Sequence, residues 1–129
     1  MTKVPLFARC ARADLARIAK VADEIDLKAG KMLVKEGSRG REFFVILEGE
    51  VAVRRGTRRL RSLGPGDFFG ELSLVTDLPR TATVTAITPL RALVVTRRAF
   101  RELMKRHPDF QLKILEAAAD RLAVTHPLH

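Results

Sequence analysis

The start of the chain has a helical pattern of apolar residues, and the pattern changes after about residue 22. Between residues 10 and 22 the apolar positions follow the spacing of a helix with one buried face. They are Leu15, Ile18, Ala19 and Val21 or Ala22. From residue 24 to 96, short β-favouring runs alternate with turn residues, many of them glycines. These runs are residues 24–28, 32–35, 42–47, 51–54, 58–63, 81–87 and 91–95.

Seven or eight short strands, with a turn every several residues, are typical of an antiparallel sandwich or closed barrel. We therefore predict a mainly β protein, with an antiparallel β-barrel or double-stranded β-helix (jelly roll) over about residues 23–96. No stretch between the runs is long enough to be a linker between domains. We expect one domain over residues 1–129.

Helical spacing returns after the last strand. Thr96 precedes Phe100 and Leu103 as a candidate N-cap, and Pro108 suits the first position of a further helix. The sequence thus predicts one N-terminal helix and two C-terminal helices, the latter over about residues 97–123. The apolar face expected for the last helix consists of Phe110, Ile114, Leu115, Ala118 and Leu122.

The charge of the chain makes an anionic partner the first to consider. Its 24 Lys and Arg residues exceed its 15 Asp and Glu residues, which gives a net charge of +9. The densest basic group lies on both sides of Gly56 in an expected hairpin. It comprises Arg54, Arg55, Arg58, Arg59 and Arg61. Such a group either protects a sheet edge from pairing with other chains or contacts nucleic acid.

The sequence favours a cytoplasmic protein. Cys10 is the single cysteine, so no internal disulfide can form, which fits a reducing compartment. No apolar run approaches the roughly 20 residues of a membrane span, and the first residues lack the pattern of a secretory signal. We expect no contact with a membrane.

One segment, residues 68–84, departs from the strand pattern and has the composition of a phosphate site. Gly70 permits close approach of the backbone, and a short helical turn near Glu71 would direct N–H groups at an anion. Arg80 offers a planar fork for two phosphate oxygens. Glu71 would repel a phosphate, unless the ligand also offers hydroxyl donors, as a ribose does. Alternatively, Glu71 only favours a helix N-terminus.

The sequence Gly-Glu-Leu-Ser-Leu at residues 70–74, followed by Pro-Arg-Thr-Ala-Thr-Val at residues 79–84, resembles the phosphate-binding cassette of cyclic nucleotide-binding domains. These domains occur in cyclic nucleotide-dependent kinases, gated channels and the bacterial catabolite activator. The similarity covers nearly the whole chain, including the hairpin at residues 43–51 and the approach to the cassette at residues 63–70.

The resemblance implies roles for individual residues. Glu71 would accept the ribose 2′-OH, and Arg80 would pair with the cyclic phosphate. The Thr81 hydroxyl can donate to the phosphate, which is compatible with both cAMP and cGMP. Alternatively, Thr81 is an ordinary β-branched strand residue. The expected ligand-binding set is Gly70, Glu71, Leu72, Ser73, Arg80, Thr81 and Ala82, with the backbone N–H groups of Leu72, Ser73 and Ala82 around the phosphate. Phe69 and Thr125 are candidate contacts for the base.

Other residues have two interpretations. Five apolar residues either form walls of the site or belong to the ordinary core: Val34, Phe44, Leu47, Phe69 and Leu72. The histidines, His107, His126 and His129, lie at a helix boundary and at the chain end, which does not suit the strand-borne ligands of a metal centre. Nucleophilic catalysis is not indicated at Ser38, Ser62, Ser73 or Cys10.

We therefore expect a non-enzymatic sensor that binds cAMP or cGMP, needs no cofactor or metal, and signals by movement of its C-terminal helix. A protein partner or a homodimer through the C-terminal helices is expected. Because the sequence stops at His129, we expect no element that reads DNA directly. Two alternatives remain open: a nucleic-acid-binding β-barrel that uses the hairpin at residues 54–61, and a docking module that binds no nucleotide.

Overall fold

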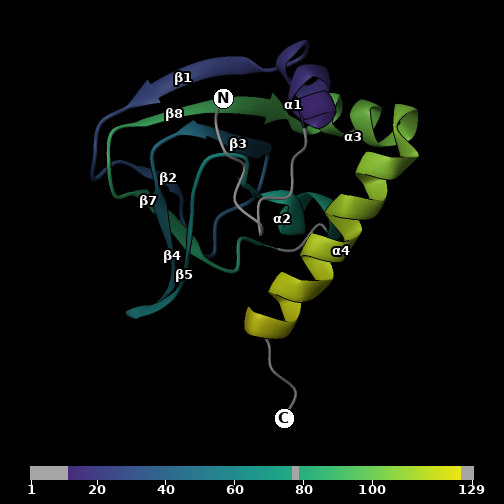
Figure 1. The fold of residues 1–129 in the computed structure, drawn as a ribbon. Helices are drawn as coiled ribbons and strands as arrows, with labels where there is room; N and C mark the ends of the chain where they lie inside the picture. The colour runs from purple at the N-terminus through teal and green to yellow at the C-terminus, as the bar shows by residue number, and fades with distance from the viewer. Residues whose placement is uncertain (1–11, 77–78, 126–129) are drawn as a thin grey trace.

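Two four-stranded antiparallel sheets form the body of the protein in the computed structural model, which describes residues 12–76 and 79–125 and the side chains up to Arg121 (Figure 1). The first sheet has the order β1 (Asp23–Leu27), β8 (Leu90–Thr96), β3 (Glu42–Glu48) and β6 (Phe68–Phe69). The second has the order β2 (Met32–Val34), β7 (Thr83–Ala86), β4 (Val51–Arg55) and β5 (Arg58–Leu63).

Apart from the β4–β5 hairpin, which stays in one sheet, successive strands change from one sheet to the other, and this gives a jelly-roll-like sandwich. The fold class is as predicted, but the sheets do not close into a barrel. Most strand positions agree with the sequence pattern to within one or two residues. The two-residue strand β6 was not predicted, because a pair of residues is too short to show alternation.

Strand β3 contributes side chains to two cores, one on each face of its sheet. Its side chains alternate between the faces of the sheet, and Phe43 to Ile46 are all buried. Phe44 and Ile46 join the core between the sheets. Phe43 and Val45 join a second core, where helices cover the other face of the same sheet. A fully apolar run is therefore needed here.

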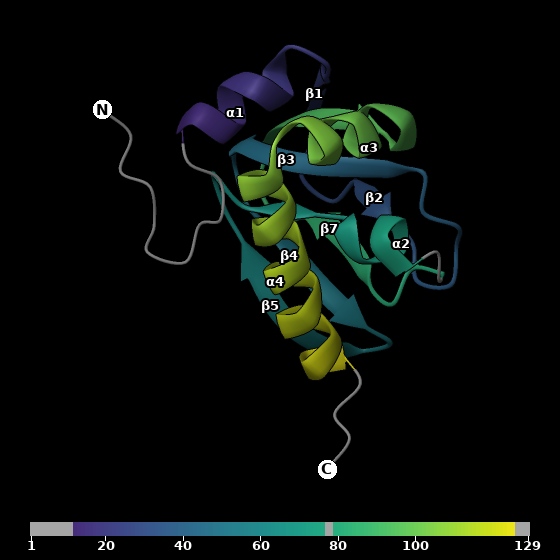
Figure 2. The same ribbon diagram turned by 90° about the vertical axis from the view of Figure 1, so that its right-hand side faces the viewer.

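Within residues 12–76 and 79–125, four helices complete the fold: α1 (Arg12–Ala19), α2 (Glu71–Thr76), α3 (Arg97–Arg106) and α4 (Pro108–Thr125). The predicted caps are confirmed, since Thr96 Oγ1 accepts the backbone N–H of Ala99 at 3.2 Å and Pro108 begins α4. Figure 2 shows α4 running from α3 past α2. No helix in the described part of the chain combines the length and apolarity needed to cross a membrane.

Three sequence predictions need correction. The first helix ends at Ala19 rather than at about residue 22, and Ala19 and Val21 of its expected apolar face are exposed. Leu115 was expected on the buried face of α4, but its side chain is 43% exposed. The buried side chains of α4, among those described, are Phe110, Ile114, Ala117, Ala118 and Arg121. Leu115 follows Ile114 directly, so it lies about 100° around the helix from it. The side chain of the predicted Leu122 lies outside the described part of the chain. The strand expected at residues 81–87 is shorter: β7 covers only Thr83–Ala86, and the backbone of Arg80 is hydrogen-bonded to Gly37 and Ser38 of the loop at residues 35–41.

The arginine-rich hairpin forms as expected, with β5 at an edge of its sheet. Arg54 lies opposite Arg59, and Arg55 lies opposite Arg58. Like charges on paired strands repel each other and discourage a further strand from adding at this edge. The register is consistent with the edge-protection interpretation of this group.

Candidate functional site

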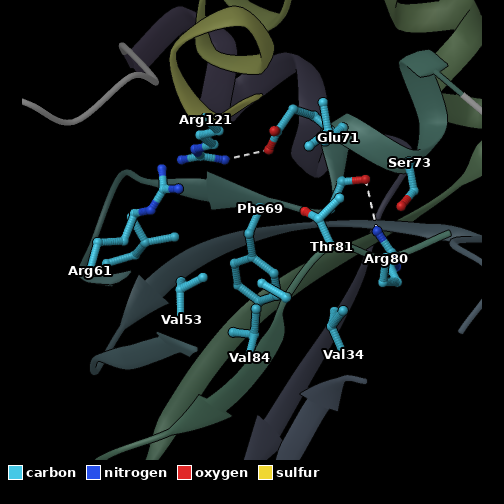
Figure 3. Close-up of a pocket in the computed structure, with 14 residues that line it drawn as sticks. Val34, Val53, Arg61, Phe69, Glu71, Ser73, Arg80, Thr81, Val84 and Arg121 are labelled. Atoms are coloured by element: carbon cyan, nitrogen blue, oxygen red, sulfur yellow. Dashed lines mark hydrogen bonds and ion pairs between the residues drawn. The ribbon is translucent and has the colours of Figure 1, made fainter. Parts of the chain in front are cut away.

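A pocket at the end of the sandwich brings together all seven predicted ligand-binding residues and Phe69 (Figure 3). The unfilled space, including the open mouth, is about 470 Å³. Its walls come from both sheets, from α2 and from α4. The predicted residues that line it are Phe69, Gly70, Glu71, Leu72, Ser73, Arg80, Thr81 and Ala82. Their contacts with a ligand stay a prediction.

Gly70 is required by the local backbone at the start of α2. Its φ is +94°, and a Cβ atom there would lie 2.7 Å from the carbonyl oxygen of Glu42 and 3.0 Å from Nη1 of Arg80. Glycine alone adopts this φ without strain. Its lack of a side chain lets β3, α2 and Arg80 meet at one point.

Arg80 is held in place by backbone carbonyl groups. Its Nη1 donates to the carbonyl oxygen of Gly70 and its Nη2 to that of Glu42, each at 2.8 Å. The residue is only 7% exposed. Burial lowers the pKa of the Arg80 guanidinium below its ordinary value, and the negative charges of Glu71 and Glu42 partly oppose that effect. The side chain therefore presents a fixed cation at the edge of the pocket.

Glu71 forms a buried ion pair with Arg121 of α4. The residue is 1% exposed, and its Oε1 accepts a hydrogen bond from Nη1 of Arg121. The Arg121 guanidinium also lies 5.0 Å from the centroid of the Phe68 ring, within the range of a cation–π contact. The expected ribose acceptor is thus already joined to the last helix.

The polar groups lie around an apolar floor. Figure 3 shows Val34, Phe69 and Val84 beneath the pocket, Arg80 and Ser73 toward one end, and Arg61 and Arg121 toward the other. A ligand with an anionic group at one end and a flat apolar body fits this arrangement.

Sequence reasoning did not place Arg61 or Arg121 in the site. Both could have been found from periodicity. In β5, Arg61 lies two residues before the buried Leu63 and therefore on the same face. In α4, Arg121 lies seven residues after Ile114 and three after Ala118, which puts a charged side chain on the buried face.

The remaining candidates divide between the pocket and other regions. Val34 and Leu72 line the pocket, whereas Phe44 belongs to the core between the sheets, where its ring stacks on that of Phe69 at 4.8 Å. Leu47 packs on the other core. The side chain of Thr125 and residues Cys10, His126 and His129 lie outside the described part of the chain.

A metal centre is not visible in the part of the chain that the structure describes. No three His, Cys, Asp or Glu side chains there are close enough to hold an ion. His107 is the C-cap of α3, and its backbone N–H donates to the carbonyl of Leu103, as expected for a residue at a helix boundary.

Comparisons with known proteins show which family the chain belongs to. A family model described as "Cyclic nucleotide-binding domain" matches residues 24–107. The chain is similar to a cAMP-dependent protein kinase regulatory subunit of Mycosarcoma maydis, at 37% identity over 110 residues, which cover 78% of this chain and 21% of that protein. It is also similar to a CRP-like cAMP-activated global transcriptional regulator of Mycobacterium tuberculosis, at 30% identity over 98% of this chain and 58% of that protein.

Solved structures have the same fold. One described as "cAMP bound PfPKA-R (141-441)" matches 81% of this chain and 37% of its own with a TM-score of 0.71 and 26% identity. Another, described with the words "A cyclic-GMP-dependent signalling pathway regulates bacterial phytopathogenesis", matches 88% of this chain and 94% of its own with a TM-score of 0.75 and 26% identity. The family match spans the sandwich, the cassette and α3, and on that ground this chain belongs to the cyclic nucleotide-binding domain family.

Proposed function

We propose that this chain is a regulatory module that binds one cyclic nucleotide, cAMP or cGMP, and reports it through α4 rather than by catalysis. The observation that carries the proposal is the convergence of Arg80, Ser73 and Glu71 on one pocket with an apolar floor. A cyclic nucleotide offers the matching groups: an anionic phosphate, a ribose hydroxyl and a flat base. Relatives named for cAMP support the same class of ligand.

The phosphate would lie against Arg80 and Ser73. Two of the five N–H groups of the Arg80 guanidinium bind the carbonyls of Gly70 and Glu42, which leaves donors for phosphate oxygens. Because those carbonyls already orient the guanidinium, little side-chain entropy is lost when the ligand binds. The family resemblance adds the backbone N–H groups of Leu72, Ser73 and Ala82 and the hydroxyl of Thr81.

The ribose would lie against Glu71, and this contact would connect the ligand to α4. A carboxylate can accept several hydrogen bonds, so Glu71 can accept a ribose hydroxyl while Arg121 stays bound to Oε1. The ligand would then stabilise the position of α4 over the pocket, because the affinity for the ligand would be highest while Arg121 is bound to Glu71. Signalling requires this difference in affinity between the two positions of the helix.

Calorimetric titration of cAMP and cGMP into the wild type, Arg80→Lys and Arg80→Ala tests the proposal. We expect Arg80→Ala to cost about 2 to 5 kcal/mol of binding, the range for loss of one partner of a buried charge pair. Arg80→Lys should recover only part of the loss, because an ammonium group cannot bind both carbonyls and the phosphate in the same fork geometry. Thermal unfolding without ligand shows whether each variant is folded.

If the folded wild type bound neither nucleotide, the proposal would be wrong, and the nucleic-acid-binding barrel and the docking module would be the alternatives to test. Equal affinity in the wild type and a folded Arg80→Ala variant would contradict the role given to Arg80.

We further propose a protein contact on the exposed side of α4. Leu112 and Leu115 are 58% and 43% exposed and are three residues apart, so they lie on neighbouring positions of one helix face. Such a face fits the expected contact through the C-terminal helices, either with a second copy of the chain or with another protein. A cytoplasmic setting and a single domain over residues 1–129 stay predictions.

A further inference from the structure

We propose that the outer side of Arg80 belongs to a second binding site, which takes a small phosphate-class anion such as pyrophosphate. A second hollow lies beside the nucleotide pocket, between β2 and the loop at residues 35–41. Its unfilled space is about 630 Å³, including the open mouth. It shares Val34 and Arg80 with the nucleotide pocket, so the two hollows have a common wall.

The lining of the outer hollow is strongly cationic. Lys35, Arg39, Arg41 and Arg80 line it, together with one carboxylate, Glu42. Four cations around one concave surface attract an anion, and arginine side chains suit phosphate oxygens because of their planar fork of donors. Pyrophosphate carries several charged oxygens at separate positions, so it can contact more than one of these side chains at once.

The loop that carries these cations is fixed against Arg80. The backbone N–H of Gly37 donates to the carbonyl of Arg80, and the N–H of Arg80 donates to the carbonyl of Ser38, both at 2.8 Å. Gly40 approaches so closely that a Cβ atom there would lie 2.8 Å from Cζ of Arg80. The backbone from which Lys35, Arg39 and Arg41 project is therefore ordered before any anion binds, which lowers the entropic cost of binding.

The shared arginine couples the two sites, and this step rests on the proposed function. Nη1 of Arg80 reaches Gly70 of the nucleotide pocket, while Nη2 reaches Glu42 of the outer hollow. Anions on both sides of one guanidinium compete for its donors and repel each other. An anion in the outer hollow should therefore weaken binding of the cyclic nucleotide, and the nucleotide should weaken binding of the anion by the same factor.

The anion site is tested first without any nucleotide. Pyrophosphate is titrated calorimetrically, at constant ionic strength, into the wild type, into the double variant Arg39→Gln/Arg41→Gln and into the matched control Arg58→Gln/Arg59→Gln. The control removes the same charge from the hairpin. We expect the first double variant to lose at least about fivefold in pyrophosphate affinity, given the range for exposed charge pairs, and the control to stay within twofold of the wild type.

Equal losses in both double variants would overturn the proposal, since they would show attraction by net charge only. Unchanged affinity in Arg39→Gln/Arg41→Gln would also overturn it, because the pyrophosphate would then lie in the nucleotide pocket. The coupling is tested by repeating the cyclic nucleotide titration with saturating pyrophosphate. The nucleotide affinity should fall severalfold in the wild type and not in Arg39→Gln/Arg41→Gln, and an equal fall in both would refute the coupling alone.

Discussion

At the scale of single residues, the pair formed by Glu71 and Arg121 connects the cassette with the last helix. Both partners are buried, so removal of one leaves a charge without its counter-ion in a poorly hydrated place. We expect Glu71→Gln to lower the free energy of unfolding by about 3 kcal/mol. The change Arg121→Leu should cost less in a Glu71→Gln background than alone. Urea unfolding of both single variants and the double variant gives the coupling energy, and additive effects would contradict a direct pair.

Gly70 gives a second test at this scale, with a matched control in the same chain. Gly70 and Gly30 have nearly equal φ values, +94° and +89°, but a Cβ atom would meet the Glu42 carbonyl at 2.7 Å only at Gly70. Both changes to alanine introduce backbone strain of about 1 kcal/mol. We expect Gly70→Ala to cost about 1 to 3 kcal/mol more than Gly30→Ala, since overpacking adds to the strain. Equal losses of stability in thermal unfolding would show that the contact is unimportant.

At the scale of elements, ion pairs attach α4 to the rest of the protein at two places, in addition to its apolar packing through Phe110, Ile114 and Ala117. Near its start, Lys113 Nζ lies 2.5 Å from Oδ2 of the buried Asp14. Nη1 of Arg17, in α1, lies 3.1 Å from Oδ2 of Asp109. Near its end, Arg121 binds Glu71. The first attachment joins helix to helix, and the second joins the helix to the pocket. A change of ligand therefore acts directly only on the second half of α4.

The attachment near the start of α4 should depend on pH. The hydrogen bond from Arg17 is the main cause that lowers the pKa of Asp109 below its ordinary value of 3.8. A carboxyl group with a lowered folded-state pKa adds stability above its unfolded pKa, and loses that contribution as pH falls through the folded value. Asp109→Asn should therefore be less stable than the wild type at pH 7, and the two should converge below about pH 3.8. A difference in melting temperature that stays constant down to pH 2 would contradict this.

At the scale of the whole molecule, sequence patterns predicted the fold well and the site incompletely. Glycine positions, strand alternation and the two caps at Thr96 and Pro108 depend on local chemistry, so they could be recognised in one dimension. Two features depend on how distant elements pack: the sheets do not close into a barrel, and Leu115 is exposed. The cassette residues were found because they form two short runs with a recognisable pattern, whereas Arg61 and Arg121 reach the pocket from other elements, β5 and α4. The pairing of Glu71 with Arg121 could not be predicted without the third dimension.

The two attachments of α4 predict how ligand binding spreads through the molecule. If cAMP or cGMP adds a hydroxyl donor to Glu71 while Arg121 stays in place, opening of the second half of α4 must also break contacts with the ligand. Hydrogen exchange should therefore slow in residues 115–125 when nucleotide is bound, because local opening then costs more free energy. Residues 108–113, held by Asp14 and Arg17 of α1, should change little. In Arg121→Gln the nucleotide should still bind through the cassette, but the slowing in the second half should disappear. Equal slowing along all of α4, or slowing that persists in Arg121→Gln, would mean that the ligand reaches this helix by another route.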